Sequence, residues 1–196
     1  MRTGTLFSKH DGTALTKVLA VLFAFHFSVC ISRAGDGVDD VLQHTPMASV
    51  FALKAFGMDN QTSWTELTLT AASSYILSAG TAYTLKHVIS EKRPDDSDRR
   101  SFPSGHATFA FAGATVLSHE FGHRSPWITV GGYGVATLTA LDRIRRDRHY
   151  WHDVCAGAAI GIAATELTYF LKRKLVKNKN MDVAFTGRQL YLAVRW

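Results

Sequence analysis

The chain has 196 residues, which is enough for one domain with a sizeable buried core and leaves little length for a second. Apolar residues make up 46% and charged residues 19%, which excludes disordered, collagen-like and low-complexity classes. The formal net charge is +6, and the cations cluster in two windows, 86–100 and 143–148, as expected of a chain that meets an anion. The two cysteines, Cys30 and Cys155, are too few for a disulfide scaffold.

The amino end has the pattern of a secretory signal. Basic residues precede an apolar run over 18–31, and Ser32 and Ala34 stand three residues and one residue before a possible cut after position 34. We expect residues 1–34 to be a signal peptide or an uncleaved membrane anchor. In either case the remainder of the chain is exported or embedded in a membrane.

The sequence pattern after residue 34 predicts helices followed by a short tail. We expect helices over residues 48–57, 63–88, 104–119, 127–141 and 150–172. Ser63 is a suitable N-cap with Glu66 in the first turn, and Pro94 closes that segment. The fold class is therefore all-α, an up-and-down helical bundle over residues 35–179. Residues 180–196 form a tail whose loose alternation allows a short hairpin.

Two of these segments approach the length of a membrane span. Residues 67–85 and 154–171 are apolar, but they are rich in Thr, Ser, Gly and Ala, and the second contains Glu166. Small residues suit close helix packing in lipid or in water. We expect association with a membrane and assign no number of spans.

Three motifs carry the candidate chemistry. The first is Lys86, six residues, then Arg93-Pro94; the second is Pro103-Ser104-Gly105-His106; the third is Arg143, five residues, then His149, three residues, then Asp153. Each motif adjoins a predicted helix end, and in an up-and-down bundle these four ends share one pole. We expect the motifs to converge there, with two helix amino termini whose N–H groups favour an anion.

The residue types in these motifs suit a bound oxyanion. The oxygens of a phosphate can be bound by the planar guanidinium groups of the arginines and by the positive charge of the lysine. Ser104 and the backbone N–H of Gly105 provide further hydrogen-bond donors. His149 and Asp153 are four residues apart, so the carboxylate can orient an imidazole that acts as a nucleophile or base. His106 is then left to protonate a leaving oxygen.

Over residues 64–172 these motifs resemble those of the type 2 phosphatidic acid phosphatase superfamily, which includes bacterial acid phosphatases and vanadium haloperoxidases. The resemblance implies a helical bundle that hydrolyses phosphomonoesters or pyrophosphates without a metal ion or cofactor. It implies that His149 attacks phosphorus, Asp153 orients it and His106 donates the leaving-group proton. The phosphoryl oxygens would be held by Lys86, Arg93, Ser104, Gly105 and Arg143. One departure is Asp142, which stands where the family usually has a small residue, and we expect it to turn toward Arg143 or a neighbouring cation.

Other functions remain open. His119-Glu120-Phe121-Gly122-His123 matches the zinc-protease pattern, but Gly122 and Pro126 predict that the helix ends there. His149, His152 and Asp153 could bind a metal, although the arginine-rich loop beside them would repel a cation. For the whole chain, the alternatives are a vanadate-dependent haloperoxidase and a noncatalytic module that binds an anion or a lipid.

The expected substrate is a lipid or polyprenyl phosphate, and no nucleic-acid partner is expected. Basic residues around Lys172 follow the fourth long helix at the pole opposite the motifs, so the positive-inside bias predicts a site that faces away from the cytoplasm. The expected location is the cell membrane or the periplasm. The sequence does not predict an oligomeric state.

Overall fold

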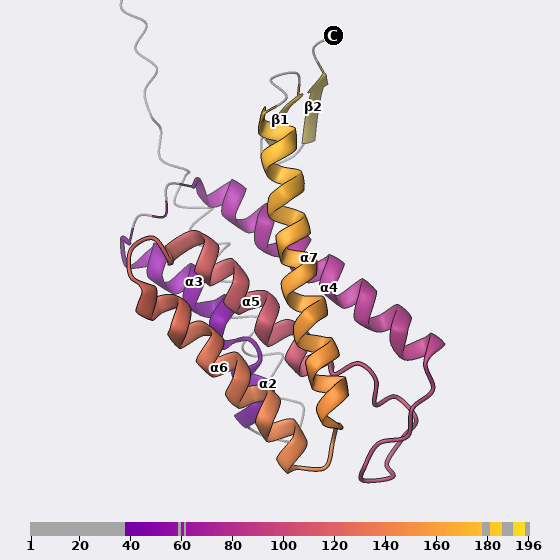
Figure 1. The fold of residues 1–196 in the computed structure, drawn as a ribbon. Coiled ribbons are helices and arrows are strands. Elements are labelled where there is room, and N and C mark those ends of the chain that lie inside the picture. Colours follow the sequence, from indigo (N-terminus) through magenta and orange to yellow (C-terminus); the bar gives the residue numbers. More distant parts are fainter. Residues whose placement is uncertain (1–37, 59, 61, 178–180, 186–189, 195–196) are drawn as a thin grey trace, which may run out of the picture.

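The structure is a computed structural model that describes residues 38–58, 60, 62–177, 181–185 and 190–194. Within these described residues, six helices are followed by two strands (Figure 1). Their bounds are α2 Val38–Leu42, α3 Thr45–Ala55, α4 Trp64–Val88, α5 Gly105–Phe121, α6 Pro126–Arg145, α7 Trp151–Lys177, β1 Met181–Phe185 and β2 Leu190–Val194. The expectation for residues 1–34 lies outside the described residues.

The long helices begin where the sequence provides caps. The Oγ of Ser63 accepts a hydrogen bond from the backbone N–H of Glu66 at the start of α4, and Ser125 caps α6 in the same manner. The helix predicted over residues 127–141 was too short, because α6 continues four residues beyond Leu141 and ends at Arg145. Asp142 forms ion pairs with arginines three and four positions later, and cations in a last turn complement the helix dipole.

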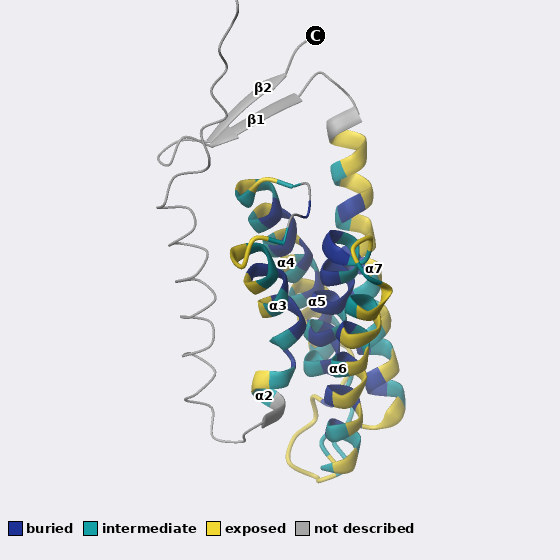
Figure 2. Ribbon diagram, turned by 90° about the vertical axis from the view of Figure 1, so that its left-hand side faces the viewer, coloured by how far each residue is buried: buried dark blue, intermediate teal, exposed yellow. Residues whose placement is uncertain are grey.

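The bundle is built around α5, which packs against α3, α4, α6 and α7. This central helix is largely buried (Figure 2). Small residues allow α7 to approach it closely, since a Cβ on Gly157 would lie 2.4 Å from the carbonyl oxygen of Ser104. At Gly161 the corresponding distance to the carbonyl oxygen of Thr108 is 2.3 Å. The predicted all-α bundle is confirmed.

Large apolar side chains also cover the outer faces of the bundle. Most of the exposed ones lie on three helices: Leu69, Ile76, Tyr83 and Val88 on α4; Trp127, Val130, Leu138 and Leu141 on α6; Trp151, Leu167, Phe170, Leu171 and Leu175 on α7. One helix among the described residues is long and apolar enough to cross a membrane, over Trp151–Leu175, with 33% of the most apolar window buried. The exposed apolar faces therefore point to a lipid environment rather than to water alone.

The tail forms two short strands. β1 and β2 pair antiparallel, with Val183 opposite Leu192. This pairing confirms the predicted β-like tail after the last helix. Neither strand belongs to the helical bundle.

Candidate active site

The ends of four helices meet at one pole of the bundle. α4 and α6 end there, and α5 and α7 begin there (Figure 1). Two backbone hydrogen bonds join the segments: Ser104 N–H donates to the carbonyl of Asp153 at 2.9 Å, and Asp95 N–H donates to the carbonyl of Asp147 at 3.1 Å. The convergence predicted from the helix order is thus present in the structure.

His149 and Asp153 form a buried pair at this pole. The Nδ1 of His149 lies 3.5 Å from Oδ2 of Asp153, and both side chains are almost fully buried. The same Oδ2 accepts hydrogen bonds from Ser101 Oγ at 2.5 Å and from the backbone N–H of Tyr150 at 2.9 Å. Because these donors fix the carboxylate beside Nδ1, the second ring nitrogen, Nε2, is left for an electrophile.

The electrostatic surroundings keep this imidazole neutral. Burial lowers the pKa of His149 well below its ordinary value, and the positive charges of Arg93, Lys86 and Arg143 lower it further. Asp153 opposes this effect only in part. At neutral pH the ring is therefore uncharged and keeps a lone pair, as a nucleophile requires.

The cations are held by backbone and side-chain acceptors. Lys86 Nζ donates to the carbonyl of Arg100 at 2.9 Å, and Arg93 Nε donates to Oδ1 of Asp98 at the same distance. Burial, and then the charge of Arg93, lower the pKa of Lys86 to about 8. Arg143 is 7% exposed at the end of α6. The electrostatic effect of all three on His149 indicates a positive site that suits an anion.

The start of α5 offers donors and open space. Ser104 is fully buried and caps the helix, with its Oγ accepting from the N–H of Ala107 at 3.4 Å. Its hydroxyl hydrogen remains available to donate. A Cβ on Gly105 would have no atom within 4 Å, so the space beside this backbone is open. A helix amino terminus with such space suits a phosphoryl group.

His106 is the second residue of α5. It contacts Asp40, which the sequence did not indicate as a site residue. Its Nε2 lies 2.7 Å from Oδ1 of Asp40 on α2. Ser101 was also missed, although it is fully buried and donates to the carboxylate of Asp153. No sequence motif links Asp40 or Ser101 to the site, because each contacts a partner more than fifty positions away in the sequence.

Asp142, the departure from the family pattern, is paired with two arginines. Its Oδ1 lies 3.2 Å from Nη2 of Arg145, and its Oδ2 lies 2.8 Å from Nε of Arg146. Its negative charge is thus balanced by neighbouring cations, as predicted. An anion bound near Arg143 therefore meets a neutralised carboxylate.

A group of residues of metal-binding types overlaps the candidate site, because Asp153 belongs to both. Glu91, His152 and Asp153 each bring one ligand atom within 4.8 Å of the others. His152 Nε2 lies 2.7 Å from Oε1 of Glu91 and 3.3 Å from Oδ1 of Asp153. By ligand type these residues could hold a divalent cation. In the structure, Nε2 of His152 lies between the carboxylates of Glu91 and Asp153.

The zinc-protease pattern has a structural role instead. α5 ends at Phe121, so His119 and His123 do not share one continuing helix. The Glu120 carboxylate is buried and accepts hydrogen bonds from Asn60, Thr62 and Tyr169 at 2.6–2.7 Å. His119 pairs with Glu166 at 2.8 Å. The predicted helix end is confirmed.

Comparison with known proteins identifies the family. The profile described as the PAP2 superfamily matches residues 67–177. The chain belongs to the PAP2 superfamily. The lipid A 1-phosphatase of Porphyromonas gingivalis is 38% identical over 135 residues, which cover 68% of this chain and 30% of that protein. Lipid phosphate phosphatase 1 of Arabidopsis thaliana is 33% identical over 81 residues, or 36% of this chain and 25% of that protein.

This PAP2 chain thus spans less than a third of the length of these two relatives. Among solved structures, Aquifex aeolicus LpxE matches with a TM-score of 0.53 and 24% identity, covering 81% of this chain and 88% of the other. At that identity the match supports the helical fold alone. The family match over residues 67–177 and the three motifs lead to the same superfamily.

Proposed function

We propose that this PAP2 chain is a metal-independent phosphatase that hydrolyses a phosphomonoester or pyrophosphate of a lipid through a phosphohistidine at His149. One observation carries the proposal: a buried, neutral imidazole has one nitrogen beside Asp153 and lies within the electrostatic influence of three cations. A neutral imidazole can form a bond to phosphorus, and the cations attract the phosphoryl group that it attacks.

In the first step, the lone pair on His149 Nε2 forms a bond to phosphorus while the bond to the leaving oxygen breaks. His106 gives its proton to that oxygen. The imidazole becomes positive as the new bond forms, and the adjacent Asp153 stabilises this charge. The remaining phosphoryl oxygens are held by Lys86, Arg93, Ser104, Gly105 and Arg143.

In the second step, water attacks the phosphohistidine. Neutral His106 takes a proton from the water, and the phosphorus–nitrogen bond breaks with its electron pair returning to Nε2 of His149. Inorganic phosphate leaves, and both imidazoles regain their starting protonation. No step requires a metal ion.

The apolar outer faces and the relatives support a lipid substrate. Exposed apolar side chains cover α4, α6 and α7, and the names of the two relatives both refer to lipid phosphates. In a membrane, such side chains would contact lipid, and a lipid phosphate would reach the site from the bilayer surface. The class includes polyprenyl phosphates. Nucleic acid is not proposed as a substrate.

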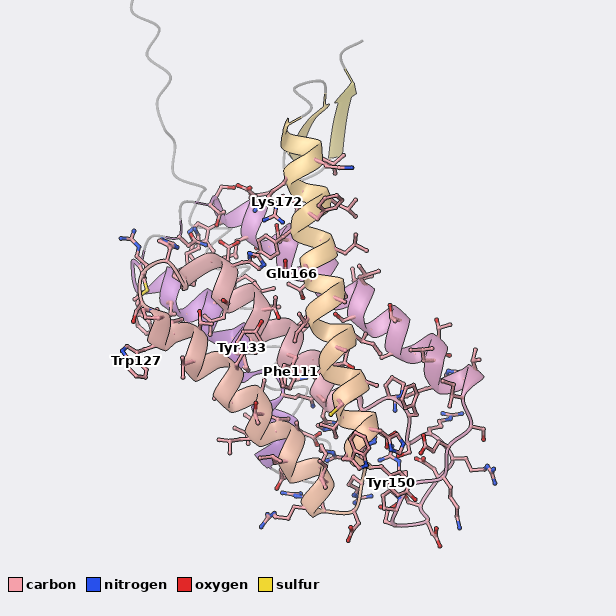
Figure 3. All side chains as sticks on the ribbon, viewed as in Figure 1. Phe111, Trp127, Tyr133, Tyr150, Glu166 and Lys172 are labelled. Carbon is pink, nitrogen blue, oxygen red and sulfur yellow. The ribbon has the colours of Figure 1, made fainter. Side chains whose placement is uncertain are left out.

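The distribution of basic residues supports a site outside the cytoplasm. Lys172 and Tyr150 lie at opposite ends of α7 (Figure 3), so the basic end of the helix is remote from His149. Under the positive-inside bias, that basic end would lie in the cytoplasm. We propose that residues 1–34 act as a signal or anchor and that 35–179 form the phosphatase domain.

Phosphate release measured in EDTA tests the proposal. The full chain is assayed with phosphatidate, a polyprenyl pyrophosphate and p-nitrophenyl phosphate, beside His149→Ala and the control His119→Ala. We expect activity in EDTA that is lost in His149→Ala and kept in the control, since His119 lies at the other end of α5. Activity abolished by EDTA, or retained by His149→Ala, would contradict the mechanism.

A further inference from the structure

The contact between α2 and α5 pairs a carboxylate with a candidate catalytic imidazole. Asp40 Oδ1 lies 2.7 Å from His106 Nε2, and the two side chains are 19% and 21% exposed. Gln43, one turn later, donates from Nε2 to the carbonyl of Asp40 at 3.2 Å. The short distance and partial burial make this a defined hydrogen-bonded pair rather than a loose surface contact.

We propose that Asp40 is a positioning residue that orients His106 and keeps it protonated for the transfer to the leaving oxygen. The inference rests on the proposed phosphatase function. With Nε2–H donating to the carboxylate, the proton that moves is the one on Nδ1. As the phosphorus–oxygen bond breaks, that proton passes to the leaving oxygen and His106 becomes neutral. Water returns a proton to Nδ1 when the phosphohistidine is hydrolysed.

A carboxylate beside an imidazole favours the charged form of the ring. Each helix that contacts α5 carries or adjoins titratable groups. They include Asp40 on α2, His44 before α3, Lys86 on α4, Arg143 on α6, and His149 with Asp153 around the start of α7. Removal of the Asp40 carboxylate would therefore favour loss of the His106 proton.

The neighbouring His44 lies within the electrostatic influence of the same carboxylate but carries no charge. Burial, and then the nearby His106, lower the pKa of His44 to about 4. His44 is therefore neutral at physiological pH, and its ring packs against Tyr75 and Phe109. The negative charge of Asp40 thus remains available to His106.

A positioning role predicts an effect that depends on the leaving group. A poor leaving group needs the proton from His106, whereas p-nitrophenolate leaves without it. Asp40→Asn should lower kcat on short-chain phosphatidate about 10- to 100-fold and on p-nitrophenyl phosphate less than ~3-fold. The alkaline limb of the phosphatidate pH profile should move to lower pH, because the amide no longer favours the protonated ring.

The experiment uses the full chain, with Asp40→Asn, His106→Ala, the double variant and Asp40→Glu. Glu166→Gln is the matched control, because Glu166 forms a similar 2.8 Å pair with His119 at the other end of α5. In the His106→Ala background, Asp40→Asn should cause no further loss. Asp40→Glu keeps the carboxylate and should retain the wild-type pH profile, which provides a test even if the asparagine variant fails to fold.

Several results would overturn the inference. These are an Asp40→Asn variant as active on phosphatidate as Glu166→Gln, an equal loss on both substrates, a further loss in the His106→Ala background, or a shifted pH profile in Asp40→Glu. Failure of the wild-type chain to release phosphate from any substrate would instead contradict the proposed function.

Discussion

Alanine in place of Gly157 should move α7 away from α5 and lower kcat/KM. A Cβ at this position would lie 2.4 Å from the carbonyl oxygen of Ser104 and 3.1 Å from Oγ1 of Thr108. An ordinary contact is about 3.5 Å, so the helices must separate by about 1 Å. The obstacle is backbone, which cannot rotate away as the end of a side chain can.

This displacement would reach the site directly. Asp153 lies one helical turn before Gly157, and its carbonyl accepts the hydrogen bond from Ser104 N–H that joins the starts of the two helices. A misplacement of about 1 Å in a catalytic group costs about 100-fold in rate. We therefore expect kcat/KM for p-nitrophenyl phosphate to fall by about that factor.

Gly134→Ala on α6 is the matched control. A Cβ there would have no atom within 4 Å, and alanine favours a helix over glycine, so activity should be unchanged. Steady-state kinetics and thermal unfolding are measured for both variants. Wild-type kcat/KM in Gly157→Ala would show that the close approach of α7 to α5 does not set the site geometry.

Three further perturbations test other parts of the structure. With the pKa of Lys86 at about 8, its charge is present below that pH and lost above it. Wild-type kcat/KM should therefore fall above pH 8, whereas Lys86→Arg should extend the plateau; identical pH profiles would contradict this. Ser101→Ala removes a donor to Asp153 and should lower kcat/KM about 10-fold or more, and unchanged kinetics would refute its role. Glu120→Ala leaves three donors without their acceptor and should lower the free energy of unfolding by about 3 kcal/mol or more in denaturant titration. A change under about 1 kcal/mol would contradict that network.

The helices were predictable because local signals mark their ends. Ser63 and Ser104 each cap a helix where the sequence predicts one, and α6 begins at Pro126, one residue before its predicted start. The five-residue α2 was not predicted, since one short turn has no apolar period to detect. It forms through contacts with α3, α5 and α6, which no local pattern reports.

In the site, too, features set by local sequence were predictable and contacts between helices were not. The order of the helices predicted that Lys86, Arg143 and His149 would share a pole, because antiparallel neighbours bring alternate ends together. The partners of the catalytic candidates were not predicted. Asp40 lies 66 positions from His106, and such pairs depend on how helices dock rather than on sequence spacing.

Trapping of a phosphoenzyme tests the central claim most directly. The chain is mixed with excess substrate carrying radioactive phosphorus, quenched within a turnover, and digested to locate the label. We predict one acid-labile, alkali-stable phosphoryl group on His149, which is absent from His149→Ala and present in His119→Ala. Phosphate release without any label on His149, or with label on another residue, would contradict the account.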